Sequence, residues 1–149
     1  MFCLRPHKED SALLLKIKKL SIPQCSTSYD DKDIKAWLAY CNAQEPKTCF
    51  TDDQGFIAYN NDKPIGFVTF SDKNNLGHID NMFILPAHTK KSLGTTLLQL
   101  AEKNLRKNDI KTISIRVTLN AQDFYAHFGY LPKKSAKARA GFEIVIMEK

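Results

Sequence analysis

Apolar residues recur every three or four positions in four stretches of the chain, and each stretch predicts an amphipathic helix. Trp37 falls on the apolar side of the second stretch and is expected in the core. The last stretch is short and ends at Gly129, a residue type suited to the position just after a helix. The predicted helices cover residues 9–20, 32–42, 93–107 and 121–128.

Other stretches alternate apolar and polar residues, or are nearly all apolar, and these predict strands. They cover residues 2–4, 56–59, 65–70, 76–85, 113–119 and 142–147. The turn-forming run Asn60–Pro64 joins the second and third into a hairpin. A strand–helix–strand unit in the second half implies a parallel pair of strands. The pattern therefore predicts one α/β domain over residues 1–149, with a mixed sheet and helices on both faces.

Charge is distributed unevenly along the chain. The net charge of +6 arises entirely in residues 76–149, because residues 1–75 hold ten acidic and ten basic side chains. A basic half of a domain implies an anionic partner, and both nucleic acid and a phosphorylated cofactor qualify.

The sequence lacks the marks of several other classes. No apolar stretch approaches the ~20 residues that span a bilayer, and the first residues lack the pattern of a signal peptide. These absences predict a cytoplasmic protein with no membrane partner. Cys3, Cys25, Cys41 and Cys49 form no C-x-x-C pair, so reduced thiols are expected and no metal site is predicted.

The first segment with candidate chemistry runs from residue 81 to residue 98. A strand ends there, a polar loop follows, and a helix begins with free N–H groups that suit an anion. Lys90 and Lys91 add positive charge, and Gly94 permits close approach of the backbone. The pattern is typical of a phosphate site, although lysines in such a loop are also often only solvated.

The second segment runs from residue 119 to residue 130. Asn120 is a suitable N-cap for the short helix that follows. Tyr125 lies just over one helical turn beyond it, and its hydroxyl can donate a proton. Phe124 and Phe128 are interpreted as residues that pack this helix on the sheet.

Together the two segments resemble the GNAT superfamily of acetyl-CoA-dependent N-acyltransferases. The resemblance covers about residues 50–149 and is carried by the strand Ile79–Pro86 and by the spacing of Asn120, Tyr125, Gly129 and Tyr130. It implies a mostly antiparallel sheet of six to seven strands with one splayed parallel pair. In the pyrophosphate loop the family's Gln/Arg and two Gly positions fall on Thr89, Lys90 and Ser92, and Gly94 keeps the expected type.

The resemblance also implies roles for residues. Acetyl-CoA is the implied co-substrate, with its pantetheine arm in the opening between the strand ending at Leu85 and Ile113–Val117. Backbone groups of Phe83 and Leu85 would polarise the thioester, and Tyr125 would protonate the departing thiolate. The implied cofactor contacts are Phe83, Ile84, Leu85, Thr89, Lys90, Lys91, Ser92, Leu93, Gly94, Thr95, Asn120 and Phe124.

A general base for the acceptor amine is harder to assign. Asp80 and His78 lie on one strand and share a face if that strand is regular. Glu143 is a third candidate, and a water relay is a fourth. Asp80 is the preferred candidate of these.

The predicted function is transfer of an acetyl group to a primary amine of a small molecule, an amino acid or a protein. The first alternative is an acyl-CoA-binding sensor without catalysis, because the loop departs from the family pattern. The second is a basic nucleic-acid-binding module. A homodimer through the C-terminal strands is common in the family.

The charge pattern leaves the acceptor's charge open. Acids of the N-terminal half, on the acceptor side in the family, would allow a cationic acceptor: Asp30, Asp31, Asp33, Asp52 and Asp53. Lys133, Lys134, Lys137 and Arg139 could instead meet an acidic acceptor, but that run is more typical of a solvated loop.

Overall fold

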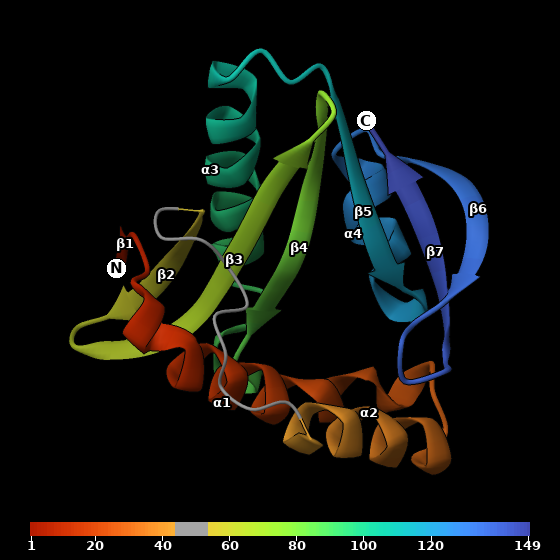
Figure 1. The fold of residues 1–149 in the computed structure, drawn as a ribbon. Helices are drawn as coiled ribbons and strands as arrows, with labels where there is room; N and C mark the ends of the chain where they lie inside the picture. Colours follow the sequence, from red (N-terminus) through yellow and green to blue (C-terminus); the bar gives the residue numbers. More distant parts are fainter. Residues whose placement is uncertain (44–53) are drawn as a thin grey trace.

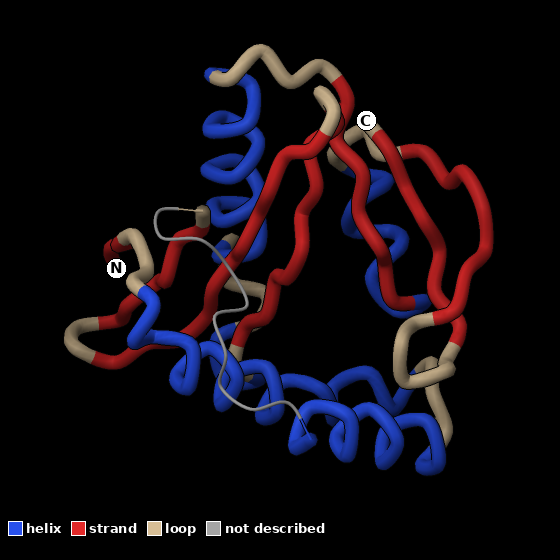
Figure 2. Tube along the Cα trace, viewed as in Figure 1, coloured by secondary structure: helices blue, strands red, loops and turns tan. Residues whose placement is uncertain are grey.

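A seven-stranded sheet with helices on both faces forms the protein (Figures 1 and 2). The computed structural model describes residues 1–43 and 54–149. The strand order is β1-β2-β3-β4-β5-β7-β6, and every neighbouring pair is antiparallel except β4 and β5. The predicted mixed sheet with one parallel pair is therefore confirmed.

The elements follow one another along the chain as β1 (Phe2–Leu4), η1 (Lys8–Asp10), α1 (Ser11–Ser21), η2 (Ile22–Thr27), α2 (Asp31–Ala43), β2 (Gly55–Asn60), β3 (Lys63–Lys73), β4 (Leu76–Ile84), η3 (Pro86–His88), α3 (Leu93–Lys107), β5 (Thr112–Thr118), η4 (Leu119–Ala121), α4 (Gln122–His127), β6 (Leu131–Lys137) and β7 (Glu143–Glu148). No helix in these described ranges is long and apolar enough to cross a membrane.

The two faces of the sheet are covered by different helices (Figure 1). On one face the apolar side of α3 packs against β3 and β4, with Leu97 and Leu98 buried among Val68 and Ile79. On the other face α1 packs through Leu14 and Ile17 against β2 and β3. Alternate residues of one strand thus enter different cores, as the strand period requires.

β4 and β5 lie side by side only at their beginnings. Their parallel register runs from Leu76 opposite Thr112 to Ile79 opposite Ile115, and then the strands diverge (Figure 1). Gly77 allows the close packing at the joined end, because a Cβ there would lie 2.9 Å from a methyl carbon of Ile110. Past this point β5 pairs with β7 alone among the described strands. A wedge therefore opens between the second half of β4 and β5.

A β-bulge at Asp80 changes which residues of β4 face the wedge. Ile79 pairs with Phe70 and Asn81 with Thr69, so Asp80 has no residue opposite it on β3. Ile79 belongs to the core beneath α3, and after the bulge Met82 joins that core while Phe83 turns to the opposite side. The strand is thus not regular, and the bulge brings two successive residues to one face.

One strand was missed by the sequence analysis. Residues 133–137 were interpreted as a solvated loop, but β6 pairs with β7 along its whole length at the edge of the sheet. The interpretation is wrong because most β6 side chains are exposed, so no alternation of apolar residues marks the strand. Lysines and a proline on such an edge also discourage pairing with another chain.

Two of the described thiols form no disulfide. Cys3 and Cys25 are free, and burial raises the pKa of both. Cys49 lies outside the described residues, as do Asp52 and Asp53.

A buried tyrosine ties the N-terminal helices to the far side of the wedge. The Tyr29 hydroxyl donates to the carbonyl of Glu143 and accepts from the N–H of Leu119 at 2.9 Å. Its ring packs edge-on against Trp37 and Phe142. Tyr29 therefore connects the segment after α1 to the end of β5 and the start of β7.

Replacing Tyr29 by Phe should lower the free energy of unfolding by about 1–3 kcal/mol, because two part-buried backbone groups lose their partner. Urea denaturation measures the change. The matched control is Tyr59→Phe, whose half-exposed ring stacks on Phe2, and it should change stability by less than about 0.5 kcal/mol. Equal stability of the two variants would show that the Tyr29 bridge contributes nothing.

Candidate active site

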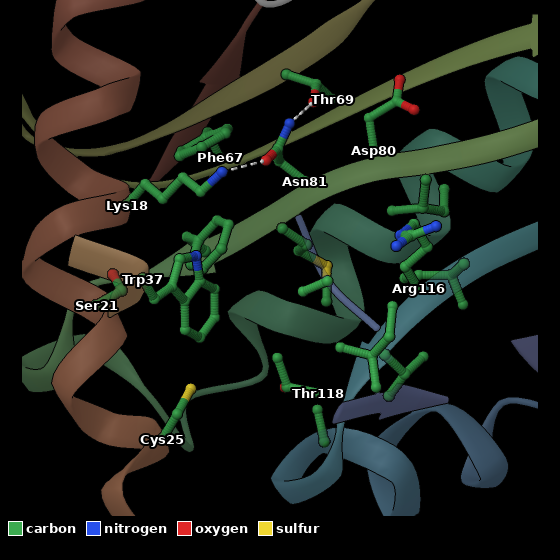
Figure 3. A pocket seen from close by; sticks show the side chains of 18 of the residues that line it. Lys18, Ser21, Cys25, Trp37, Phe67, Thr69, Asp80, Asn81, Arg116 and Thr118 are labelled. Atoms are coloured by element: carbon green, nitrogen blue, oxygen red, sulfur yellow. Dashed lines mark hydrogen bonds between the residues drawn. The ribbon is translucent and has the colours of Figure 1, made fainter. Parts of the chain in front are cut away.

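A cavity of about 1280 Å³ occupies the wedge between β4 and β5. Its walls come from α1, η2, α2, β3, β4, β5, the start of α4 and the loop before β7 (Figure 3). An aromatic group forms one part of the wall, where Trp37 lies 6.2 Å from Phe83 and 4.5 Å from Phe142, measured between ring centroids. The cavity can therefore hold a large molecule against an apolar surface.

The bulged part of β4 supplies the polar wall. His78, Asp80 and Asn81 all line the cavity. Desolvation raises the pKa of the Asp80 carboxyl, although a hydrogen bond from Ser71 and the charge of His78 oppose this shift. Asp80 is exposed and lines the cavity, so its carboxylate can take up a proton from a bound molecule.

A short chain of polar side chains crosses from β3 to α1. The Asn81 Nδ2 donates to Thr69 Oγ1 at 3.0 Å, and the Lys18 Nζ donates to Asn81 Oδ1 at 3.3 Å (Figure 3). The Lys18 Nζ also lies 5.5 Å from the centre of the Phe83 ring. Sequence reasoning missed Lys18 and Asn81, because their meeting depends on the bulge and on how α1 packs.

Backbone groups at the end of β4 divide between two directions. The Leu85 N–H donates to the carbonyl of Ile65 at 2.9 Å, so it faces β3. Because hydrogen-bonded pairs alternate along an antiparallel ladder, Phe83 opposite Phe67 also turns its N–H to β3. The expectation that Phe83 and Leu85 donate into the opening is therefore wrong. The N–H groups of Met82 and Ile84 face the open side instead.

The Ile84 carbonyl confirms this direction. It accepts from Ser21 Oγ at 3.0 Å and from Gln24 Nε2 at 2.9 Å, and both donors come from the helical segment across the wedge. The end of α1 and the start of η2 are thus fastened to the diverging strand.

The loop before α3 adopts left-handed backbone at two residues. Lys90 has φ 61° and Ser92 has φ 60°, and both side chains are exposed. These are the two positions where the resemblance has glycines, which adopt such angles without strain. The first N–H groups of α3 point out of the helix and have no carbonyl within it to bind. Thr89 lines the cavity beside this loop.

Two residues expected in the anion site take part in packing. Leu93 is buried in the main core. At Gly94 a Cβ would lie 3.2 Å from the Phe124 ring, so the glycine lets α4 approach α3 closely. Phe124 also contacts Phe128, which agrees with its interpretation as a packing residue. Leu93 and Gly94 can contribute to an anion site only through their N–H groups.

Tyr125 lines the cavity from α4 and is almost fully buried. Burial raises the pKa of its hydroxyl far above the ordinary value, so the group stays protonated at neutral pH. Asn120 also lines the cavity but lies within η4, and the N-cap of α4 is Ala121 without a side-chain bond. The prediction that Asn120 caps the helix is wrong, because a 3-10 turn leads directly into α4. Its side chain instead lowers the pKa of the Cys25 thiol, against the larger effect of burial.

The remaining candidates lie elsewhere. Glu143 is exposed on β7 and does not line the cavity, whereas Thr95 lies in the first turn of α3 and Lys91 is exposed in the loop before it. Within the described ranges no group of three or more His, Cys, Asp or Glu residues could hold a metal ion.

Comparisons with known proteins agree with this geometry. The crystal structure of a GCN5-related N-acetyltransferase from Rhodopseudomonas palustris matches with a TM-score of 0.84 at 22% identity, over 99% of this chain and 94% of that one. PaiA N-acetyltransferase from Thermoplasma acidophilum, in complex with coenzyme A, matches with a TM-score of 0.77 at 22% identity, over 100% and 99%. An aminoglycoside 6′-acetyltransferase type Ii matches with a TM-score of 0.67 at 16% identity, over 100% and 96%.

These similarities show the fold, and a sequence comparison shows the family. A search of curated proteins gave no sequence match. The sequence model of the acetyltransferase (GNAT) domain, however, matches residues 25–149, which include the wedge, the loop before α3 and Tyr125. The chain therefore belongs to the GNAT acetyltransferase family.

Proposed function

We propose that the chain transfers an acetyl group from acetyl-CoA to a primary amine by direct attack, with Tyr125 as the general acid. One observation carries the proposal: the wedge between β4 and β5 holds a large cavity, and the buried Tyr125 is one of the residues that line it. The family membership supports acetyl transfer as the reaction class.

The donor's pyrophosphate fits the N-terminus of α3. There the N–H groups of residues 90–95 and the positive end of the helix dipole favour an anion, and Lys90 and Lys91 add charge. The thioester would then lie along β4, where the Met82 and Ile84 N–H groups face the open side. Either group can donate to the carbonyl oxygen as negative charge develops on it.

In the reaction the amine nitrogen forms a bond to the carbonyl carbon and the carbon–sulfur bond breaks. The thiolate takes the Tyr125 proton, and the proton of the amine passes to Asp80, to His78 or to water. Tyr125 is a weaker acid than a free phenol because it is buried. The same apolar surroundings destabilise the thiolate and raise its affinity for a proton, so the phenol and the departing thiolate stay closer in basicity than the shift of Tyr125 alone would give.

Replacing Tyr125 by Phe should lower kcat by about 10²- to 10⁴-fold, because the thiolate must then leave without a proton donor. A thiol-release assay with acetyl-CoA and a panel of amines measures the change. The control is Tyr130→Phe, because the Tyr130 hydroxyl bonds to Glu102 at 2.9 Å, and this variant should lose stability but keep kcat. Unchanged turnover in Tyr125→Phe would exclude the hydroxyl as the acid.

The Asp80 carboxyl should set the acidic limb of the pH–rate profile. Its raised pKa means that the carboxylate, the form able to act as base, is lost as pH falls through a value above that of an ordinary aspartate. The rate should fall there, and Asp80→Asn should remove this limb. If His78→Gln removes the limb and Asp80→Asn leaves it, the histidine is the base.

The loop before α3 supports a second candidate, an acyl-CoA-binding sensor without catalysis. A non-glycine residue in left-handed backbone costs about 1–2 kcal/mol, and two occur here. Such strain weakens a site that needs the loop's amides aligned. Measurable binding of acetyl-CoA without acetylation of any amine would favour this candidate.

Ser92→Gly should relieve strain, raise the melting temperature and keep or improve acetyl-CoA affinity, whereas Ser92→Val should weaken both, because a β-branched residue is strongly disfavoured at this φ. Thermal unfolding and calorimetry with acetyl-CoA measure the two effects. Gln99→Val, on the exposed side of α3, controls for the general cost of valine. Equal affinities of the two Ser92 variants would exclude the loop as the pyrophosphate site.

A further inference from the structure

We infer that the acceptor is an apolar amino acid and that Lys18 binds its carboxylate. This inference rests on the proposed function and names the substrate class of that site. It is carried by a lysine that is fixed at the cavity wall and that pairs with an amide oxygen rather than with a carboxylate.

The position of the Lys18 ammonium is fixed through Asn81 by the buried residue Thr69. Thr69 is 1% exposed, and its Oγ1 accepts from Asn81 Nδ2. That bond turns the Asn81 oxygen toward α1, where Lys18 donates to it. An ammonium group has three N–H donors, so two remain for a ligand in the cavity. Figure 3 shows the Lys18 side chain extending from α1 toward Asn81.

The charge of the described cavity wall favours an anionic acceptor. Lys18, Arg116 and Arg139 line the cavity, and Asp80 is the acidic residue among the described lining. Of the acids expected to attract a cation, Asp30, Asp31 and Asp33 do not line the cavity, and Asp30 accepts from the N–H of Asp33 at the start of α2. Asp52 and Asp53 lie outside the described residues. A positive wall also favours the neutral form of an amine, which is the form that attacks.

The surroundings of Lys18 suit an apolar body beside the carboxylate. Its ammonium lies over the Phe83 ring, and Phe83 is in contact with Trp37. Trp37 in turn packs on Phe142. An apolar side chain of the acceptor would pack against these rings, while its carboxylate stays in the polar part of the cavity at Lys18. The inferred acceptor class is therefore an amino acid with an aromatic or aliphatic side chain.

The bulge places the group that holds Lys18 next to the preferred base. Asn81, which accepts from Lys18, directly follows Asp80 in β4, and both line the cavity. An α-amino acid separates its amine and carboxylate by one carbon atom, so it would bind with its carboxylate at Lys18 and its amine on the Asp80 side of Asn81.

The test compares phenylalanine with phenylalaninamide, which differ in one charge. The amine of the amide is the weaker base, so a larger fraction of it is unprotonated and able to attack at neutral pH. Amine reactivity alone therefore favours acetylation of the amide, and a preference for phenylalanine must come from the protein. We expect wild-type protein to acetylate phenylalanine with a kcat/KM about 10- to 100-fold above that of the amide. Lys18→Gln, which keeps a donor for Asn81, should abolish the preference.

Lys19→Gln is the matched control, because Lys19 is the next residue of α1 and does not line the cavity. It should keep the preference for the acid. A wild-type preference for the amide, or a preference that survives in Lys18→Gln, would overturn the inference.

Calorimetric binding of the same two compounds to the protein saturated with coenzyme A separates this inference from the proposed function. If phenylalanine binds, Lys18→Gln abolishes binding and no amine is acetylated, the carboxylate site stands and the proposed reaction fails. If amines are acetylated but phenylalanine binds no better than its amide, the reaction stands and the carboxylate site fails.

Discussion

The separation of β4 from β5 after four residue pairs is the constraint on which the rest of the structure depends. Each backbone group of β4 beyond Ile79 that faces β5 loses a ladder partner and must find another. The Ile84 carbonyl is satisfied by Ser21 and Gln24 from the helical segment, which also fixes that segment across the opening. The N–H groups of Met82 and Ile84 remain directed to the open side, where an extended ligand can pair with them as an added strand does.

The bulge at Asp80 adds polar side chains to the wall of this opening. Without it, Asp80 and Asn81 would lie on opposite faces of β4, and one of them would enter the core beneath α3. With it, both line the cavity, and Asn81 meets Thr69 on one side and Lys18 on the other. A single extra residue in a strand therefore determines which polar groups share the cavity.

Sequence patterns predicted the helices and strands whose apolar residues recur with a clear period. They failed for features that depend on how strands pair in the folded protein. The helix at residues 93–107 was predicted at its observed bounds because leucines mark one face over its whole length. β6 was missed because most of its side chains are exposed to solvent, so no apolar alternation marks it. The bulge was missed because no residue type is specific to such a position. Tyr125 could be singled out by its spacing from Gly129, but Lys18 could not, since its partner lies on another element.

The two segments that carry the family resemblance, residues 81–98 and 119–130, differ in what holds their backbone in place. Gly129 follows α4 with φ 90°, so another residue there would strain the backbone. Tyr130 is fully buried and its hydroxyl donates to Glu102, so a change there would disturb the core directly. The loop before α3 is different, because its path is fixed from outside. Leu93 anchors it in the core, and Phe124 packs on Gly94. These contacts hold Lys90 and Ser92 in left-handed backbone without glycine, since a strained conformation persists where the surrounding structure determines it. The loop can therefore keep its path although its sequence has departed from the family pattern.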